Sequence, residues 1–182
     1  MKTLHCSQCR LEHPAGTLGR CTKCDGILSP EYSDETVQSL AMIPPGEGVD
    51  RYRSVLPTQA AIPYLGEGNT PLISSRRIGH GLGLKSLFFK HEGCNPSGAF
   101  KDRAGALAAA LAQEAGAKGV ITASSGNAAA ALAAYAAAAG LRCLILLEPE
   151  APPAKLRQIV LTGAKVIPVD GLFSREIGRA HV

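Results

Sequence analysis

From about residue 71 onward, short apolar segments alternate with alanine-rich segments, and this alternation restricts the fold more than any other feature of the chain. Short apolar strands joined by helices form a parallel sheet covered on both faces. Ligands of such sheets bind at the carboxyl ends of the strands, where loops lead into helices. The sequence therefore predicts an α/β fold, with a parallel sheet in a three-layer αβα arrangement. We expect strands at 87–90 (short and buried), 120–123, 143–147 and 165–169, and helices at 101–115, 127–139 and 153–162.

Composition narrows the possible partners. The chain has 182 residues, of which 46% are apolar and 19% charged, as is ordinary for a globular protein. Its formal net charge of +4 is spread without a basic run, and only 4% of residues are aromatic, so we expect no nucleic-acid partner. The longest apolar run, 128–139, is almost entirely alanine. We therefore expect no membrane segment and a cytoplasmic location.

Four cysteines near the N-terminus form two close pairs, Cys6 with Cys9 and Cys21 with Cys24. Each C-x-x-C turn offers two thiolates, and a tetrahedral zinc ion needs four such ligands. We therefore expect residues 1–32 to form a zinc-ribbon-like segment with a structural Zn²⁺. The alternative is a redox or metal-free knuckle. Residues 33–70 contain strong breakers and are expected to form an irregular connecting segment.

A lysine stands at the expected start of a helix. Pro96 and Gly98 favour a turn immediately before Lys101. A lysine at a helix N-terminus, in a partly desolvated cleft, has its ammonium form disfavoured, which makes the amine available for a covalent bond to a carbonyl. The plain alternative is a solvated surface lysine.

A second polar segment, Ser124-Ser125-Gly126-Asn127, joins an expected strand to the following helix. Hydroxyls, exposed backbone N–H groups and a helix N-terminus together favour an anion such as a carboxylate or phosphate. The alternative is a simple helix cap, because Ser and Asn are preferred there.

Together, four segments carry a resemblance to a known family. Residues 95–103 (NPSGAFKDR) resemble the lysine motif of fold type II pyridoxal-phosphate (PLP) enzymes, and 124–127 resemble their substrate-carboxylate loop. Residues 66–72 (GEGNTPL) resemble the family's G-E-G-x-T-P-L segment, and 163–166 resemble its G-A-x-V turn. A cysteine ribbon ahead of these motifs is most similar to threonine synthases.

The resemblance implies roles for individual residues. Lys101 would bind PLP covalently and move protons on the substrate, and Asn127 would contact the ring hydroxyl of the cofactor. Ser124 and Ser125, with Asn127, would hold the α-carboxylate of a small amino-acid substrate. The implied reaction is that of a lyase in threonine biosynthesis, which converts O-phospho-L-homoserine and water to L-threonine and phosphate. The implied parent enzyme is a homodimer.

Two departures keep alternatives open. Ala99 stands where many relatives have Ser, and Ala128 stands where many have Thr or Gly. A cysteate synthase or a serine/threonine dehydratase of the same fold therefore remains possible. A non-catalytic binding module built on the zinc ribbon is the alternative from another class.

Two parts of the family's site are not found in the sequence, namely its glycine-rich phosphate loop and the residue that meets the pyridine nitrogen. We therefore interpret residues 71–176 as a partial PLP-binding α/β domain, truncated at its C-terminal side and expected to be inactive alone. Residues 177–182 do not resemble the family, and we interpret them as a non-native tail derived from a sequencing adapter; the alternative is a natural, divergent C-terminus.

Overall fold

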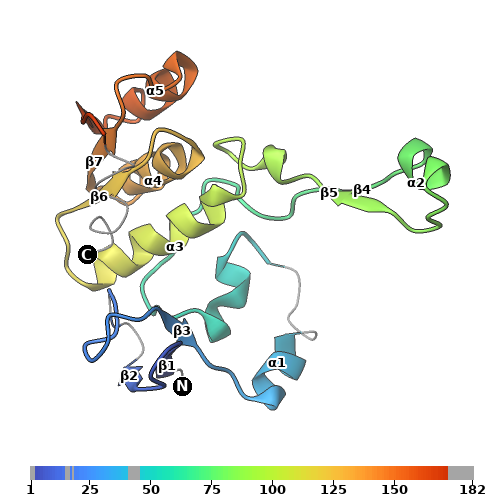
Figure 1. The fold of residues 1–182 in the computed structure, drawn as a ribbon, viewed down its shortest axis with the longest axis horizontal. Helices are drawn as coiled ribbons and strands as arrows, with labels where there is room; N and C mark the ends of the chain where they lie inside the picture. Colours follow the sequence, from blue (N-terminus) through green and yellow to red (C-terminus); the bar gives the residue numbers. More distant parts are fainter. Residues whose placement is uncertain (1–2, 15–16, 18, 41–45, 172–182) are drawn as a thin grey trace.

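The computed structural model describes residues 3–14, 17, 19–40 and 46–171, so the expected tail at 177–182 lies outside the described residues. At the N-terminus, three short strands form an antiparallel sheet in the order β2-β1-β3 (Figure 1). They are β1 (Thr3–Cys6), β2 (Glu12–Pro14) and β3 (Leu28–Pro30). This small sheet carries the turns that hold the cysteine pairs.

In its described residues, the segment expected to be irregular contains the helix α1 (Asp34–Leu40) and the 3₁₀ helix η1 (Asp50–Val55). Ser33 explains the start of α1, because its Oγ accepts the backbone N–H of Thr36 at 3.3 Å. A side-chain acceptor at this position satisfies one of the unpaired N–H groups of the first turn. The cap signal at Ser33 is visible in the sequence but was not used in the prediction.

The parallel sheet is present as predicted, in the order β6-β7-β8. The expected alternation of strands and helices is confirmed, with bounds shifted by at most a few residues. The elements are β6 (Gly119–Ala123), β7 (Arg142–Leu147), β8 (Lys165–Pro168), α3 (Lys101–Glu114), α4 (Asn127–Ala138) and α5 (Pro153–Val160).

Helix α4 is buried on two sides, which accounts for its alanine content. One side packs on the sheet, where Ala133 joins a core cluster with Ile145 and Ile159. The other side packs on α3, and a Cβ added to Gly105 would lie 3.1 Å from the ring of Tyr135. Small side chains on both helices permit this close approach, since larger ones would be overpacked.

The described helices cover one face of the parallel sheet. Along β7, buried Ile145 alternates with Leu144 and Leu146, which point to the opposite face. The register partners of these leucines, Ile121 and Ile167, are 52% and 46% exposed. The expectation that both faces are covered is therefore not met by the described residues, because no described helix packs on this second face.

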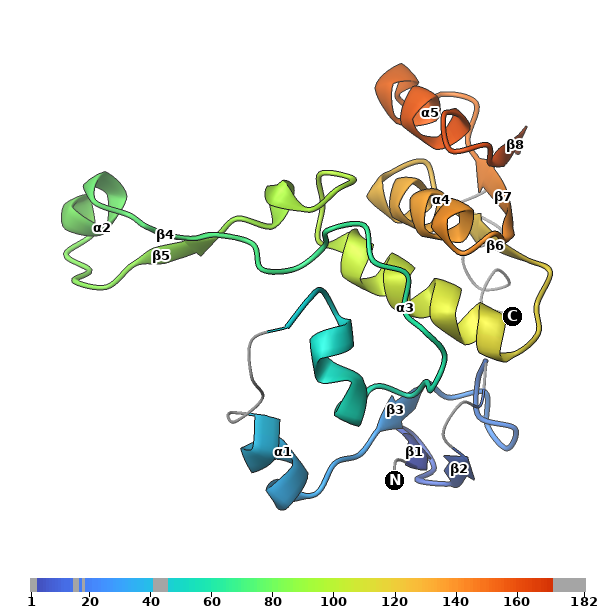
Figure 2. The ribbon, with the colours of Figure 1, turned by 180° about the vertical axis from the view of Figure 1, so that it is seen from behind.

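A two-stranded antiparallel arm projects from the body (Figures 1 and 2). It consists of β4 (Leu72–Ser74), α2 (Arg77–Gly81) and β5 (Phe88–Lys90). The strand predicted at 87–90 is present as β5, but the prediction that it is buried is wrong, since Phe88 and Phe89 are 51% and 46% exposed. An apolar run in the sequence predicts a strand but does not show whether another segment packs on its side chains. Among the described residues, no helix combines the length and apolar character needed to cross a bilayer.

Candidate functional site

The turn before Lys101 is held from two sides. It follows the 3₁₀ helix η2 (Glu92–Cys94), and Gly98 adopts a φ of 82°, which favours glycine. Buried Asp102 accepts the backbone N–H of Ser97 on Oδ2 at 2.7 Å. From α5, Gln158 donates to the carbonyl oxygen of Ser97 at 3.0 Å. These contacts fix the backbone from which Lys101 begins α3, as the sequence predicted.

Within the described residues, the amine of Lys101 has a ring contact but no hydrogen bond or ion pair. Its side chain is half-buried, and its Nζ lies 4.9 Å from the centroid of the Phe100 ring. Among the described residues, no acceptor is hydrogen-bonded to this amine. Lys101 is therefore available to a ligand.

The Ser124–Asn127 loop lies at the carboxyl ends of neighbouring strands. The N–H of Ser124 donates to the carbonyl of Leu146 at 2.9 Å, which places the loop beside the end of β7. The Oγ of Ser124 accepts the N–H of Gly126 at 3.2 Å and so stabilises the loop itself. The side chains of Ser125 and Asn127 have no hydrogen-bond partner within the described part of the chain. Both remain available to a ligand.

Helices α3 and α4 run in the same direction, which brings the two motifs to one end of the helix pair (Figures 1 and 2). Gly105 of α3 lies against Ala131 of α4, and Gln113 donates to the carbonyl of Ala139 at 2.9 Å. Each pair is separated by 26 residues in the sequence. The same offset joins the first residues of the two helices, Lys101 and Asn127.

Two buried polar atoms next to Lys101 lack partners. They are Oγ of Ser97 and Oδ1 of Asp102, and neither has a hydrogen bond within the described residues. Buried polar atoms are almost always paired, and an unpaired one costs about 1–3 kcal/mol. Together with the amine of Lys101, which has no hydrogen bond within the described residues, and the amide of Asn127, these atoms make this end of the helix pair suited to a polar ligand that carries an aldehyde and a ring hydroxyl, as PLP does.

A carboxylate-centred network ties the GEGNTPL segment to the lysine motif. Arg103 donates Nε and Nη2 to Glu92, each at 2.9 Å, and Thr70 donates its hydroxyl at 2.6 Å. Asn95 donates to the same carboxylate at 3.1 Å and accepts the N–H of Gly68 at 3.0 Å. The sequence analysis assigned no role to these residues. Gly68, Thr70, Asn95 and Arg103 lie in the recognised motifs, whereas Glu92 lies outside them and carried no signal.

This network makes stability depend on pH. The hydrogen bonds from Arg103, followed by that from Thr70, lower the pKa of the Glu92 carboxyl from 4.5 to about 2. A carboxyl whose pKa falls on folding stabilises the folded state above its ordinary pKa, and this stabilisation is lost as the pH falls from 4.5 toward 2. We expect Glu92→Gln to lower the free energy of unfolding at pH 7 by about 1–2 kcal/mol, allowing for solvent screening.

Urea unfolding between pH 3 and pH 7 measures this effect, with the exposed carboxylate of Glu150 changed to Gln as the matched control. Glu92→Gln should flatten the acidic decline in stability, and Glu150→Gln should leave it unchanged. An undiminished decline in Glu92→Gln would show that other groups cause the acid sensitivity.

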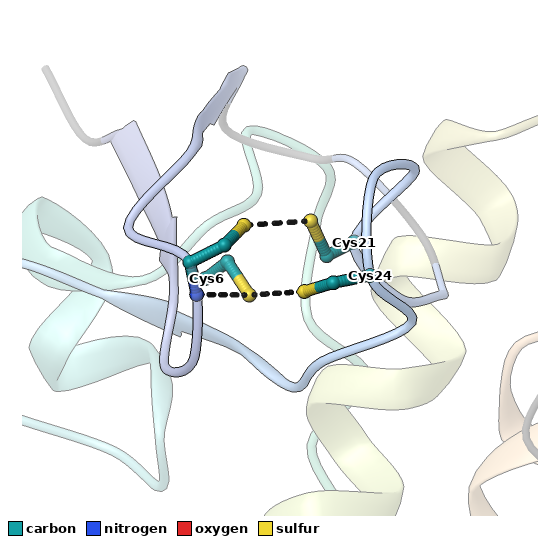
Figure 3. A group of neighbouring side chains, drawn as sticks. Cys6, Cys21 and Cys24 are labelled. Atoms are coloured by element: carbon teal, nitrogen blue, oxygen red, sulfur yellow. Dashed lines mark hydrogen bonds between the residues drawn. The ribbon is translucent and has the colours of Figure 1, made fainter.

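The four predicted zinc ligands are brought together. The sulfur of Cys6 lies 3.4 Å from that of Cys24, and the sulfur of Cys9 lies 3.6 Å from that of Cys21 (Figure 3). All four sulfurs lie within 4.8 Å of one another. Four sulfurs about 2.3 Å from one tetrahedral zinc ion would be separated by roughly 3.8 Å. The cluster therefore has the donor set and the size of a Cys₄ zinc site.

The two cysteine turns are built alike. Arg10 donates its N–H to the carbonyl of Cys6, and Asp25 donates to that of Cys21, at 3.0 and 2.9 Å. Arg10 and Asp25 both adopt a left-handed φ, of 59° and 58°. A Cβ on Gly26 would lie 2.6 Å from the sulfur of Cys6, so only glycine fits there.

Backbone donors also favour the thiolate form of Cys6. The N–H of Cys9, and then that of Gln8, donate to its sulfur and lower the pKa of the Cys6 thiol to about 6. A metal ligand must be deprotonated, so these bonds prepare the sulfur for a cation.

Comparison with known proteins adds independent evidence. Residues 64–181 match the family described as "Pyridoxal-phosphate dependent enzyme". The chain is 36% identical to threonine synthase of Methanosarcina acetivorans over 177 residues, 95% of this chain. It is 44% identical to threonine synthase of Halalkalibacterium halodurans over 133 residues, 71% of this chain. The chain spans only 44% and 37%, respectively, of the length of these two relatives.

Among solved structures, maize serine racemase is similar, with a TM-score of 0.53 and 38% sequence identity. The similarity covers 57% of this chain and 32% of that one. The fold expected from the sequence, that of fold type II PLP enzymes, is thereby confirmed.

Proposed function

This chain belongs to the pyridoxal-phosphate dependent enzyme family, and from that premise we propose that the whole enzyme is a threonine synthase. It would convert O-phospho-L-homoserine and water to L-threonine and phosphate. The observation that carries the proposal is similarity to threonine synthases along 95% of the chain, the cysteine ribbon included. The parallel register of α3 and α4, which brings Lys101 and Asn127 to one end of the helix pair, supports it.

This proposal gives each polar group of the site a defined role. PLP, when bound, supplies an electron sink for the bond-breaking steps. Lys101 holds the cofactor through its amine, and the same Nζ then removes and returns protons on the substrate carbons. Asn127 orients the cofactor through its ring hydroxyl, while Ser124 and Ser125, with Asn127, bind the substrate carboxylate. The Oγ of Ser124 accepts the N–H of Gly126, and the hydroxyl can still donate one hydrogen bond and accept another, so it can also contact a ligand.

The substrate is tested on the full-length enzyme. Incubation with O-phosphohomoserine should release phosphate and threonine in equal amounts, and O-phosphoserine should be turned over far more slowly. Preference for O-phosphoserine would make the enzyme a cysteate synthase. Deamination of serine or threonine without phosphate release would make it a dehydratase, and either result would overturn the proposal.

We further propose that Cys6, Cys9, Cys21 and Cys24 bind a structural Zn²⁺. All four ligand positions of a tetrahedral ion would be filled by sulfur, so no position would remain for a substrate. The ion would stabilise residues 1–32, whose described part has a small core.

The remaining expectations are also part of the proposal. The enzyme would be cytoplasmic and a homodimer, and it would bind a small amino-acid substrate rather than nucleic acid or membrane. A non-catalytic module built on the ribbon is the competing reading. A full-length protein that retains zinc but does not bind PLP would favour it.

A further inference from the structure

The backbone of Ser97, in the turn before Lys101, is held on both sides by side chains. Its N–H donates to Oδ2 of Asp102 at 2.7 Å, and its carbonyl oxygen accepts Nε2 of Gln158 at 3.0 Å. Within the described residues, no backbone N–H donates to this carbonyl. Because Ser97 is buried, its carbonyl depends on Gln158 for the hydrogen bond that a buried acceptor needs.

Lys155 fixes the orientation of the Gln158 side chain. The Nζ of Lys155 donates to Oε1 of Gln158 at 3.0 Å, and the two residues share one face of α5 because they are three apart. An ammonium group can only donate and a carbonyl oxygen can only accept. The amide oxygen of Gln158 must therefore face Lys155 and its NH₂ must face Ser97, since a flipped amide would lose both bonds.

Helix α5 gives Gln158 a firm base. The neighbouring Ile159 is fully buried and belongs to the core cluster that contains Ile145 of β7. Helix α4 lies between α3 and α5 (Figures 1 and 2). The turn before Lys101 is thus bonded to α3 through Asp102 and to α5 through Gln158, a contact that spans 61 residues of sequence.

Ser97 is close enough to Lys101 for its position to matter to the amine. It precedes Lys101 by four residues, and the φ of 82° at Gly98 keeps this stretch out of the helix. The helical ladder of α3 therefore does not hold Ser97, and a displacement of its carbonyl would pass along the short turn to Lys101. A misplacement of about 1 Å in a reacting group can lower a rate by about 10²-fold.

We propose that Gln158, oriented by Lys155, positions Lys101 for its reaction by holding the carbonyl of Ser97. The inference rests on the proposed function, because it takes Lys101 as the residue that holds PLP and moves protons. Gln158 acts through the turn, so it governs where the amine of Lys101 stands rather than how the substrate binds. Its loss should therefore lower kcat and leave KM nearly unchanged.

The first test measures turnover of the full-length, PLP-loaded enzyme. Gln158→Glu keeps the size of the side chain and the acceptor for Lys155 but replaces the donor that faces Ser97 with an oxygen. It should lower kcat by about tenfold or more, with KM changed by less than about twofold. Gln158→Met, which removes the donor without adding an acceptor, should give an intermediate loss.

Gln113→Glu is the matched control. Gln113 also donates its side-chain amide to a backbone carbonyl, that of Ala139 at 2.9 Å, but at the opposite end of α3 from Lys101. Gln113→Glu should change kcat by less than about twofold. Circular dichroism establishes that each variant is folded.

The second test needs neither PLP nor turnover. In the 182-residue chain without cofactor, NMR measures the hydrogen exchange of the Ser97 N–H, which Asp102 holds. Gln158→Glu should speed this exchange by about tenfold or more, and Gln113→Glu should leave it unchanged. Lys155→Met should speed it less, and should add little to Gln158→Glu because both changes act through one amide.

Unchanged exchange and unchanged kcat in folded Gln158→Glu and Gln158→Met would overturn the inference. Equal losses in Gln113→Glu would also overturn it, because they would show a general loss of stability. Failure of the proposed function is recognised separately, as an unmodified enzyme that carries PLP on Lys101 but does not turn over O-phosphohomoserine. The exchange of the Ser97 N–H then decides the inference alone.

Discussion

Lys101→Ala in the full-length enzyme should abolish covalent attachment of PLP and reduce turnover by roughly 10³-fold or more, since proton transfer and cofactor attachment are lost together. The structure gives the physical reason. Lys101 is half-buried, its amine has no hydrogen bond within the described residues, and the turn before it is fixed by Asp102 and Gln158.

The measurement is the visible absorbance of the bound cofactor, followed by activity. Lys118→Ala is the matched control, because this exposed lysine follows the opposite end of α3. It should keep both the absorbance and the turnover of the unmodified enzyme. An unchanged visible absorbance band in Lys101→Ala would refute the assignment of Lys101 as the residue that binds PLP.

Cys21→Ser should remove the zinc ion and unfold the ribbon while leaving the parallel sheet folded. Cys21 is almost fully buried and lies 3.6 Å from Cys9, so a serine there removes one of four converging ligands. Structural zinc contributes about 10–16 kcal/mol of binding free energy in small zinc domains. The ribbon has little other source of stability, because its described core contains few buried apolar residues.

Metal analysis should find one zinc per chain in the unmodified protein and much less in Cys21→Ser. Cys94→Ser is the control, since Cys94 is exposed and lies outside the cluster. In Cys21→Ser, the amide NMR signals of β1 and β3 should move to the chemical shifts of an unfolded chain, and those of β6 and β7 should keep their positions. Full zinc content in Cys21→Ser would refute the four-cysteine site. If Cys21→Ser stays folded but loses turnover, the zinc ion has more than a structural role.

The sequence predicted those parts of the fold that depend on local signals. Helix α3 and helix α4 were found because alanine runs follow turn residues, and their starts at Lys101 and Asn127 match the prediction. The cysteine cluster was predicted from spacing alone, since two C-x-x-C turns have few other uses. In each case the residues that decide the structure are close together in the sequence.

Contacts between distant residues could not be predicted in this way. The hydroxyl of Tyr135 donates to buried Glu67, a contact that spans 68 residues, and burial raises the pKa of Tyr135. The exposure of Phe88 and Phe89 was missed for the same reason, because apolar character does not specify the packing partner. A single sequence carries no signal for which distant segments meet.

The measurement that tests the central claim most directly is reduction of the PLP-loaded full-length enzyme with borohydride, followed by peptide mapping. Reduction makes the bond between the cofactor and its lysine permanent, so mass spectrometry identifies the attached residue without a variant. The account predicts a single modified peptide that carries the cofactor on Lys101. Modification of a different lysine, or no modified peptide from a folded protein saturated with PLP, would contradict it.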